Sequence, residues 1–155
     1  MRNSFLRSGR ALRLATFAAL FIGSAAHAAE PLTIDVYREL YCGCCKKWIK
    51  HLEANGFTVI DHVETNMSAV KQELGVAPHL SSCHTAVING KFVEGHVPAE
   101  QIVALSKRSD LLGIAVPSMP VGSPGMEDGG MQEAYQVIGL TNAGADQVIA
   151  EYPAP

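Results

Sequence analysis

Hydrophobic and polar positions alternate in two stretches near the start of the chain, and a helical pattern separates them. Residues 32–37 alternate and are rich in β-branched side chains, which predicts a strand, and residues 57–63 predict a second one. In residues 45–52 the apolar positions recur every three or four residues, and Asn55-Gly56 then ends the pattern, which predicts an amphipathic helix. The opening of the chain is therefore a predicted βαβ unit.

The middle of the chain continues this alternation of strands and helices. A second predicted helix begins after Asn66, which can cap it, and ends at Gly75. Residues 85–94 predict a hairpin, because an Asn-Gly pair separates two short apolar runs. Pro98 suits the first position of a third helix. The residues expected to face the core from these two helices are Met67, Val70, Leu74, Ile102, Val103 and Leu105.

The order of these elements, β-α-β-α-β-β-α, is the arrangement of thioredoxins and glutaredoxins, so the predicted fold class is α/β and thioredoxin-like. Residues 114–131 are rich in Gly and Pro, contain several Met residues and show no periodicity. We expect a long loop there, and loops of that length in a compact domain are usually functional or disordered. Residues 135–149 then predict an extra C-terminal β-hairpin.

The first 28 residues have the pattern of a secretory signal. Four arginines precede an apolar run at residues 14–22, and Ala26-His27-Ala28 supplies small residues for a signal peptidase. The run is shorter than the roughly 20 residues that span a bilayer, although an uncleaved anchor is the alternative. We expect export to the periplasm, cleavage near Ala28, no stable membrane insertion afterwards, and one metal-binding domain over residues 29–155.

The charge of the expected mature chain excludes one class of partner. Removing residues 1–28 leaves eight basic and fifteen acidic residues, a net charge of −7 with the histidines neutral. This excess of acid argues against nucleic acid, which requires a basic face. The remaining length of about 127 residues is enough for one hydrophobic core without disulfides.

Four cysteines carry the candidate chemistry, and three of them lie within four residues. Cys42 and Cys45 have the Cys-x-x-Cys spacing at the start of the first helix, where unpaired backbone N–H groups favour thiolates. A redox pair needs only these two, whereas Cys44 adds a third sulfur that suits a metal site. Two structural disulfides are the alternative, but each needs its own Cα–Cα approach of about 4.4–6.8 Å, which is difficult from one turn.

The fourth cysteine enters the third strand. In thioredoxin-like folds this segment faces the Cys-x-x-Cys turn, and it usually carries a cis-proline before a threonine. Here the segment reads Cys83-His84-Thr85. We therefore expect Cys83 to lie opposite the other three sulfurs, and the missing proline argues against the substrate-binding mode of thioredoxins.

Methionines and histidines add candidate ligands. Met119 and Met126, and less strongly Met131, fall in the Gly/Pro-rich segment, where thioethers together with thiolates would select Cu(I); filling the core is the alternative. His84 and His96 border the expected site, and imidazole also binds copper; the alternative is a hydrogen-bonded loop histidine. A four-cysteine zinc site is also chemically possible. The histidines expected at the surface or in turns are His51, His62 and His79.

Five motifs occur in order along the chain, at residues 42–48, 55–57, 82–87, 94–99 and 119–127. Together they resemble the CopG-like copper-resistance proteins, a periplasmic family of unknown function with a Cys-x-Cys-Cys motif. The resemblance implies a thioredoxin-like fold, copper bound through the cysteine turn with Cys83 as a further ligand, a sulfur-bridged cluster of several copper ions, and a role in copper tolerance. Leu40-Tyr41 departs from the small residue and proline common in relatives, which indicates a change in loop stiffness.

Three functions follow from these observations. The favoured one is a periplasmic protein of copper homeostasis or resistance that binds Cu(I), holds one or several ions, and exchanges them with other copper-handling proteins. Copper redox activity stays open. The alternative is a thiol–disulfide oxidoreductase with Cys42 as nucleophile and Cys45 as resolving thiol. The third is a small structural domain with cysteine bridges. Cys44, Cys83 and the methionine segment favour the first function.

Overall fold

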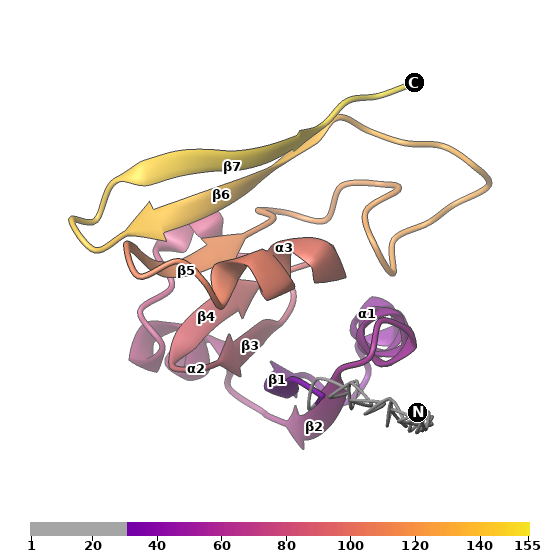
Figure 1. Cartoon of the computed structure of the whole chain (residues 1–155). Helices are drawn as coiled ribbons and strands as arrows, with labels where there is room; N and C mark the ends of the chain where they lie inside the picture. The colour runs from indigo at the N-terminus through magenta and orange to yellow at the C-terminus, as the bar shows by residue number, and fades with distance from the viewer. Residues whose placement is uncertain (1–30) are drawn as a thin grey trace, which may run out of the picture.

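The computed structural model describes residues 31–155, so the predicted signal segment lies outside the described residues. Seven strands form one sheet in the order β2-β1-β3-β4-β5-β6-β7 (Figure 1). No helix within residues 31–155 is long and apolar enough to span a membrane. The strands are β1 (Thr33–Arg38), β2 (Thr58–Val63), β3 (Thr85–Ile88), β4 (Lys91–Glu94), β5 (Leu111–Ala115), β6 (Tyr135–Thr141) and β7 (Asp146–Tyr152), and the helices are α1 (Gly43–Ala54), α2 (Met67–Glu73), the 3-10 helix η1 (Pro78–Leu80) and α3 (Ala99–Leu105).

The predicted α/β class and the predicted order of elements through α3 agree with the structure. β1 and β2 are parallel, β3 and β4 form the expected antiparallel hairpin, and β6 and β7 form the expected C-terminal one. β5, which pairs parallel to β4, falls partly inside the segment expected to be a loop. Four of its five residues are buried, so its sequence lacks the alternation that identifies a half-exposed strand.

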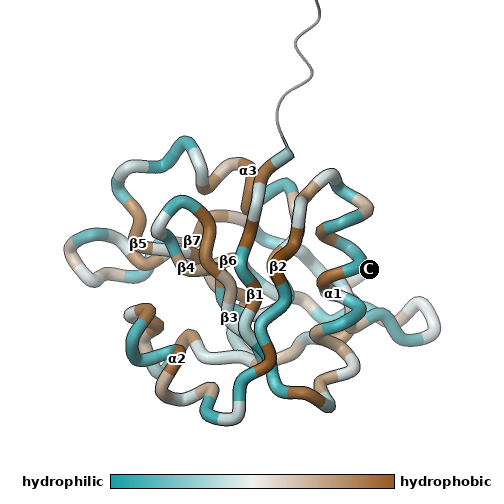
Figure 2. The backbone as a smooth tube through the Cα atoms, turned by 90° about the horizontal axis from the view of Figure 1, so that it is seen from below, coloured by the Kyte–Doolittle hydropathy of each residue, from teal (hydrophilic) through white to brown (hydrophobic). Residues whose placement is uncertain are grey.

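α1 and α3 bury their apolar residues in one hydrophobic cluster with residues of β1, β3 and β4. Trp48 and Leu52 of α1 and Ile102 and Leu105 of α3 are fully buried or nearly so. α1 alternates between hydrophobic and hydrophilic residues along its length (Figure 2), as the helical pattern predicts. The expectation for Val103 is wrong: it is 41% exposed, because it follows Ile102 and so points about 100° away around the helix.

The opposite face of the sheet carries α2, η1 and a smaller apolar cluster. Met67 at the start of α2 is buried, as predicted, and the side chain of Asn66 caps the helix by accepting from the N–H of Ala69 at 3.1 Å. η1 was not predicted, since a single turn carries no periodic signal. The smaller cluster comprises Val76, Leu80, Phe92, Ala115 and Leu140.

One buried carboxylate on this face holds the segment that enters β3. Glu94 is fully buried and accepts from Lys71 Nζ at 2.5 Å, the backbone N–H of Ser82 at 2.6 Å and Thr85 Oγ1 at 2.6 Å. Ser82 and Thr85 flank Cys83 and His84. Three donors from two segments, α2 and residues 82–85, therefore converge on one carboxylate, which fixes both ends of the Cys83-His84 pair.

The start of α3 is capped by a side chain of α1. The backbone N–H of Ala99 donates to Nε2 of His51 at 3.1 Å, whereas the N-cap residue, Pro98, provides no side-chain bond. Burial lowers the pKa of His51, although Glu100 and Glu127 oppose the shift. Because only neutral imidazole has a lone pair to accept this bond, the neutral form stabilises the junction of the two helices.

We expect this contact to make the free energy of unfolding depend on pH. Folding lowers the pKa of His51 below the unfolded value of about 6.5, so its stabilisation is present above that pH and is lost as the pH falls below it. His51→Gln keeps an acceptor but does not titrate. Between about pH 7 and pH 5, the free energy of unfolding should therefore fall less in His51→Gln than in the wild type. The difference should be up to about 1 kcal/mol, the usual contribution of a helix cap.

Urea unfolding at the two pH values measures this difference. His51→Ala is the matched control, because it removes the acceptor and should be less stable than His51→Gln at both pH values. Equal losses of stability in the wild type and His51→Gln would contradict the prediction.

Candidate metal centre

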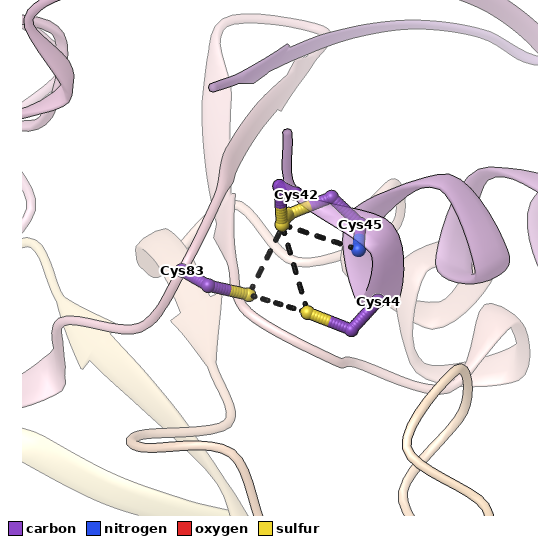
Figure 3. Close-up of side chains that lie close together, drawn as sticks. All are labelled: Cys42, Cys44, Cys45 and Cys83. Carbon is purple, nitrogen blue, oxygen red and sulfur yellow. Dashed lines mark hydrogen bonds between the residues drawn. A yellow bond between two sulfur atoms is a disulfide. The ribbon is translucent and has the colours of Figure 1, made fainter. Parts of the chain in front are cut away.

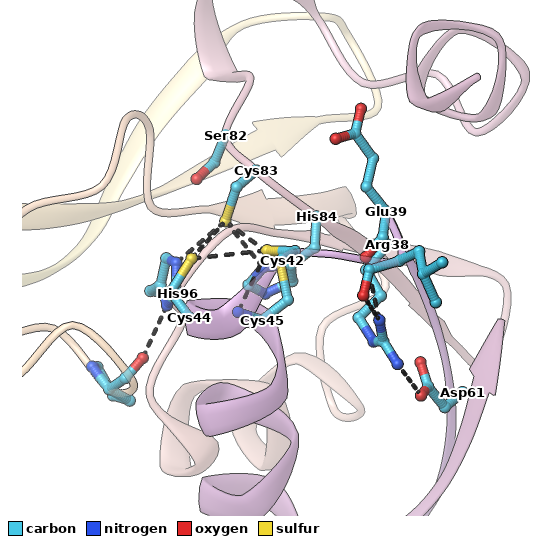
Figure 4. The surroundings of a disulfide bond; sticks show 12 residues. Arg38, Glu39, Cys42, Cys44, Cys45, Asp61, Ser82, Cys83, His84 and His96 are labelled. Atoms are coloured by element: carbon cyan, nitrogen blue, oxygen red, sulfur yellow. Dashed lines mark hydrogen bonds and ion pairs between the residues drawn. A yellow bond between two sulfur atoms is a disulfide. The ribbon is translucent and has the colours of Figure 1, made fainter. Parts of the chain in front are cut away.

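The loop before α1 is held by Arg38 at the end of β1. Its guanidinium donates to the carbonyls of Glu39 and Leu40 at 3.0 and 3.3 Å and pairs with Asp61 at 2.5 Å. Figure 4 shows this pair beside the cysteine turn. Tyr41, the residue before the turn, is 93% exposed. The loop directly before Cys42 is therefore fixed by Arg38, and its last side chain, that of Tyr41, lies in solvent.

Cys42 caps α1 and is joined to Cys45 by a disulfide. The sulfur of Cys42 accepts from the backbone N–H of Cys45 at 3.3 Å, and the two Cα atoms are 5.3 Å apart. Cys44 and Cys83 are free. The disulfide in the described residues is therefore confined to one turn, which contradicts the alternative of two structural bridges.

Cys83 brings a fourth sulfur to this turn from the start of β3 (Figure 3). Its Sγ lies 3.8 Å from that of Cys44 and 3.7 Å from that of Cys45, and the Sγ atoms of Cys42 and Cys44 are 3.6 Å apart. All four sulfurs lie within 4.8 Å of one another. Four sulfurs at these separations can hold a soft metal once the disulfide is reduced.

Two histidines also approach Cys83 (Figure 4). Its Sγ is 3.1 Å from Nδ1 of His84 and 3.1 Å from Nε2 of His96, and both rings are fully buried. The three ligand atoms also lie within 4.8 Å of one another. Cys83 is thus shared by two groups of potential ligands, one of sulfur alone and one of sulfur and nitrogen.

The orientation of His96 is set by the Gly/Pro-rich segment. Its Nδ1 lies 2.8 Å from the carbonyl oxygen of Pro124, which can only accept. Nδ1 must therefore carry the proton, and Nε2 presents its lone pair toward Cys83. The ring of His84 packs against Trp48 with centroids 4.3 Å apart, and its Nε2 is buried without a hydrogen-bond partner in the described structure.

The group of Cys83, His84 and His96 is uncharged without a metal. Burial raises the pKa of Cys83 to about 12, and the neighbouring Cys44 adds to the shift. Burial also lowers the pKa of His96, and that of His84 well below its usual value. At neutral pH Cys83 is a thiol and both imidazoles are uncharged, so a metal ion must displace the thiol proton to bind the sulfur.

The Gly/Pro-rich segment runs from β5 toward α1 (Figure 1). At Gly125, where φ is +85°, a Cβ atom would lie 2.8 Å from the backbone nitrogen of Trp48 and 3.0 Å from the carbonyl oxygen of Cys44. Only glycine allows so close an approach in this backbone conformation. Met126 therefore follows a residue that touches the cysteine helix, and it is half-buried.

The other two methionines are more exposed. Met119 is 49% exposed and follows Ser118, whose carbonyl accepts from the hydroxyl of Ser82. The hydroxyl of Ser82, next to Cys83, thus fixes the backbone of the residue before Met119. Met131 is 61% exposed, in a short bridge with Asp128.

The histidines expected at the surface or in turns differ in their surroundings. His62 and His79 are paired with aspartates at 2.7 and 2.8 Å and are partly or largely exposed. His51 is half-buried and caps α3, a contact that no local motif indicates. Sequence reasoning also missed Glu94 and Pro124. Glu94 could have been suspected, because a charged residue there occupies an inward position of a short strand.

Comparison with known proteins identifies the family. A family model described as a protein of unknown function, DUF411, matches residues 80–126, and no curated protein matches the chain. Two solved structures of copper resistance protein CopG, Form 2 and Form 1, are each 68% identical to this chain. The alignments cover 80% of this chain and 100% and 99% of those chains, with TM-scores of 0.79 and 0.78.

The chain belongs to the CopG-like family of copper-resistance proteins. The family match includes Cys83, His84 and His96 together with Pro124 and Gly125, so it covers the sulfur–nitrogen group and the segment that orients it. The cysteine turn lies before the matched residues. It is the 68% identity to the CopG structures that extends the relationship over most of the chain.

Proposed function

We propose that this protein is exported to the periplasm, binds Cu(I) through its four cysteines, and serves copper resistance or homeostasis. The observation that carries the proposal is the convergence of four sulfurs from two distant segments within 4.8 Å. The 68% identity to copper resistance protein CopG supports copper as the metal. Other periplasmic copper-handling proteins are the proposed partners, which deliver or accept the ion.

The donor set favours Cu(I) over harder ions. Thiolates are soft ligands, and Cu(I) prefers them to oxygen donors. Three pairs among the four sulfurs lie 3.6–3.8 Å apart, a separation that suits bridging between ions, so we propose that several Cu(I) ions bind together. Met119 and Met126 offer further soft donors from the Gly/Pro-rich segment. The four-sulfur site requires reduction of the Cys42–Cys45 disulfide, in which two electrons and two protons yield two thiols.

The disulfide itself favours a second candidate function, a thiol–disulfide oxidoreductase. In this reaction a substrate thiolate would attack the Cys42–Cys45 bond, form a mixed disulfide and leave one cysteine as a thiolate. Two observations argue for copper instead. His84 occupies the place before Thr85 where thioredoxins carry a proline, and the sulfurs of Cys44 and Cys83 have no part in the disulfide.

An anaerobic titration of the reduced protein with Cu(I), against a competing chelator, tests the proposal. We expect more than one Cu(I) to bind tightly per chain, and we expect Cys44→Ser to bind fewer ions, because Cys44 supplies a sulfur to the cluster but no partner to the disulfide. Disulfide reduction of insulin is measured on the same proteins. Unchanged copper binding in Cys44→Ser, together with insulin reduction that depends only on Cys42 and Cys45, would favour the oxidoreductase.

A further inference from the structure

A groove of about 920 Å³ lies between the segment that follows β5 and the hairpin of β6 and β7. We propose that it docks an extended segment of a partner protein, one that contains proline and carries Lys or Arg. The inference goes beyond the proposed copper function, because none of the four cysteines lines the groove. The lining comes from residues 117–120 of the segment and from residues 133–136, 138 and 151–153 of the hairpin.

The wall formed by residues 117–120 is held in a fixed conformation. Ser118 has a φ of +64°, in the left-handed region that a residue other than Gly seldom occupies. Its N–H donates to the carbonyl of Ser81 at 3.2 Å, and its own carbonyl accepts from the hydroxyl of Ser82. Backbone strain that neighbouring segments keep in place is typical of ligand-binding sites. Here it places the half-exposed side chain of Met119 at the groove.

The hairpin supplies two stacked aromatic rings to the other wall. Tyr135 and Tyr152 are partners across β6 and β7, with ring centroids 4.7 Å apart and planes that differ by 5°. The hydroxyl of Tyr152 also donates to Glu100 of α3 at 2.7 Å, which fixes this ring further. Proline-rich segments dock in grooves lined by aromatic side chains, because they are already extended and lose little entropy on binding. Two fixed rings therefore suit such a segment.

The exposure of the lining residues favours a chain segment over a small molecule. Every one of these described residues is exposed or half-buried, and none is buried. A site for a small molecule encloses most of the surface of its ligand, which a groove without buried walls cannot do. An extended segment needs contact along only part of its surface, so an open groove is enough to hold it.

The charge of the groove selects the kind of partner. Glu133 and Glu151 line it, and no Lys or Arg is among its described lining residues. Glu133 accepts from the N–H of Val121 at 2.9 Å, and Glu151 accepts from the side chain of Gln136 at 2.8 Å. Both carboxylates are thus held in place with capacity to accept further bonds. A basic segment complements them, whereas a second copy of this chain brings its own excess of acid.

Fluorescence polarisation with labelled synthetic peptides tests the inference. The peptides combine Pro and Leu with Lys or Arg, and matched sets replace the basic residues by Gln or Glu, or the prolines by Gly. We expect the basic proline peptides to bind best, and to bind more weakly as NaCl is raised, because salt screens exposed charges. Equal binding of the basic and Gln sets, or preference for the Glu set, would overturn the proposal.

Substitutions of Ala134 test whether the peptides bind in the groove. Ala134 is exposed and lines the groove directly before β6. Ala134→Arg and Ala134→Glu introduce opposite charges there, so the basic peptides should bind Ala134→Glu at least about fivefold more tightly than Ala134→Arg. Glu53→Gln is the matched control, because it makes the same change in net charge as Ala134→Arg on an exposed residue of α1 outside the groove. It should bind the peptides as the wild type does.

Removal of an aromatic ring provides an independent test. Tyr135→Ala should weaken binding of the basic peptides by more than about tenfold, as expected for an aromatic residue that anchors an interface. Thermal unfolding checks that the variant folds, because Tyr135 also packs against the main hydrophobic cluster. If it does not fold, the two Ala134 variants still decide the outcome.

All measurements use the folded protein without metal, so they do not depend on the copper function. If Ala134→Arg and Ala134→Glu bind the basic peptides equally, the groove is not the docking site and the proposal is wrong. Sedimentation velocity examines the remaining occupant. Self-association of the wild type that Ala134→Arg abolishes would identify a second copy of the chain in the groove, and it would also overturn the proposal.

Discussion

Replacing Cys83 by serine should reduce copper binding more than replacing any other single cysteine. Cys83 is the residue shared by the two ligand groups, so Cys83→Ser removes one sulfur from each, whereas Cys42→Ser weakens only the four-sulfur group. We expect Cu(I) affinity of the reduced protein to fall by more than about 100-fold, beyond the effect of losing an outer-shell partner.

Chelator competition on Cys83→Ser and Cys42→Ser in parallel measures this effect. Cys83 has no part in the disulfide, and serine nearly preserves its shape, so the variant should fold. Formation of the Cys42–Cys45 disulfide in the air-oxidised variant would show that the cysteine turn keeps its structure. If Cys83→Ser retained more copper than Cys42→Ser, Cys83 would not be the shared ligand.

Replacing Glu94 by alanine should destabilise the protein by about 3 kcal/mol or more, as expected when one partner of a buried ion pair is removed. Glu94 is fully buried, and the side chain of Lys71 is only 14% exposed, so Glu94→Ala leaves a largely buried ammonium without its carboxylate. The N–H of Ser82 and the hydroxyl of Thr85 also lose their acceptor. Because these residues flank Cys83, copper affinity should fall together with stability.

Urea unfolding monitored by Trp48 fluorescence measures the change in stability. Glu94→Gln is the conservative control, because it keeps the shape and one acceptor oxygen and should lose less stability than Glu94→Ala. Lys71→Met/Glu94→Gln removes both charges and should recover much of the loss, as seen when buried ion pairs are replaced by neutral residues. A change below about 1 kcal/mol in Glu94→Ala would show that the ion pair does not hold this segment.

The elements that the sequence predicts well are those with strong local patterns. α1 was recognisable from its apolar spacing, and the β3–β4 hairpin from its Asn-Gly turn, which adopts positive φ at both Asn89 and Gly90. β5 was missed because four of its five residues are buried, so its sequence shows no regular alternation. Val103 was misplaced because adjacent apolar residues on a short helix cannot all face the core.

The positions of the four cysteines in the site could be predicted from the sequence, whereas the contacts that surround them could not. Three of the sulfurs are neighbours in the chain, and the element order was enough to place Cys83 opposite them. The roles of Glu94, His51 and Pro124 were not predictable, because each depends on one contact between segments 12 to 48 residues apart. Such contacts follow from the packing of the whole fold and leave no periodic trace in the sequence.

The bond between His96 and Pro124 has a consequence for how this protein responds to mutation. The acceptor is a main-chain oxygen, so no side-chain replacement at Pro124 deletes it. An alanine scan of residues 120–127 would therefore pass over the group that fixes the tautomer of His96. Deleting or inserting one residue in this segment would instead move the carbonyl away from the ring. For the bond to His96, the length of this segment therefore matters more than the side chain at position 124.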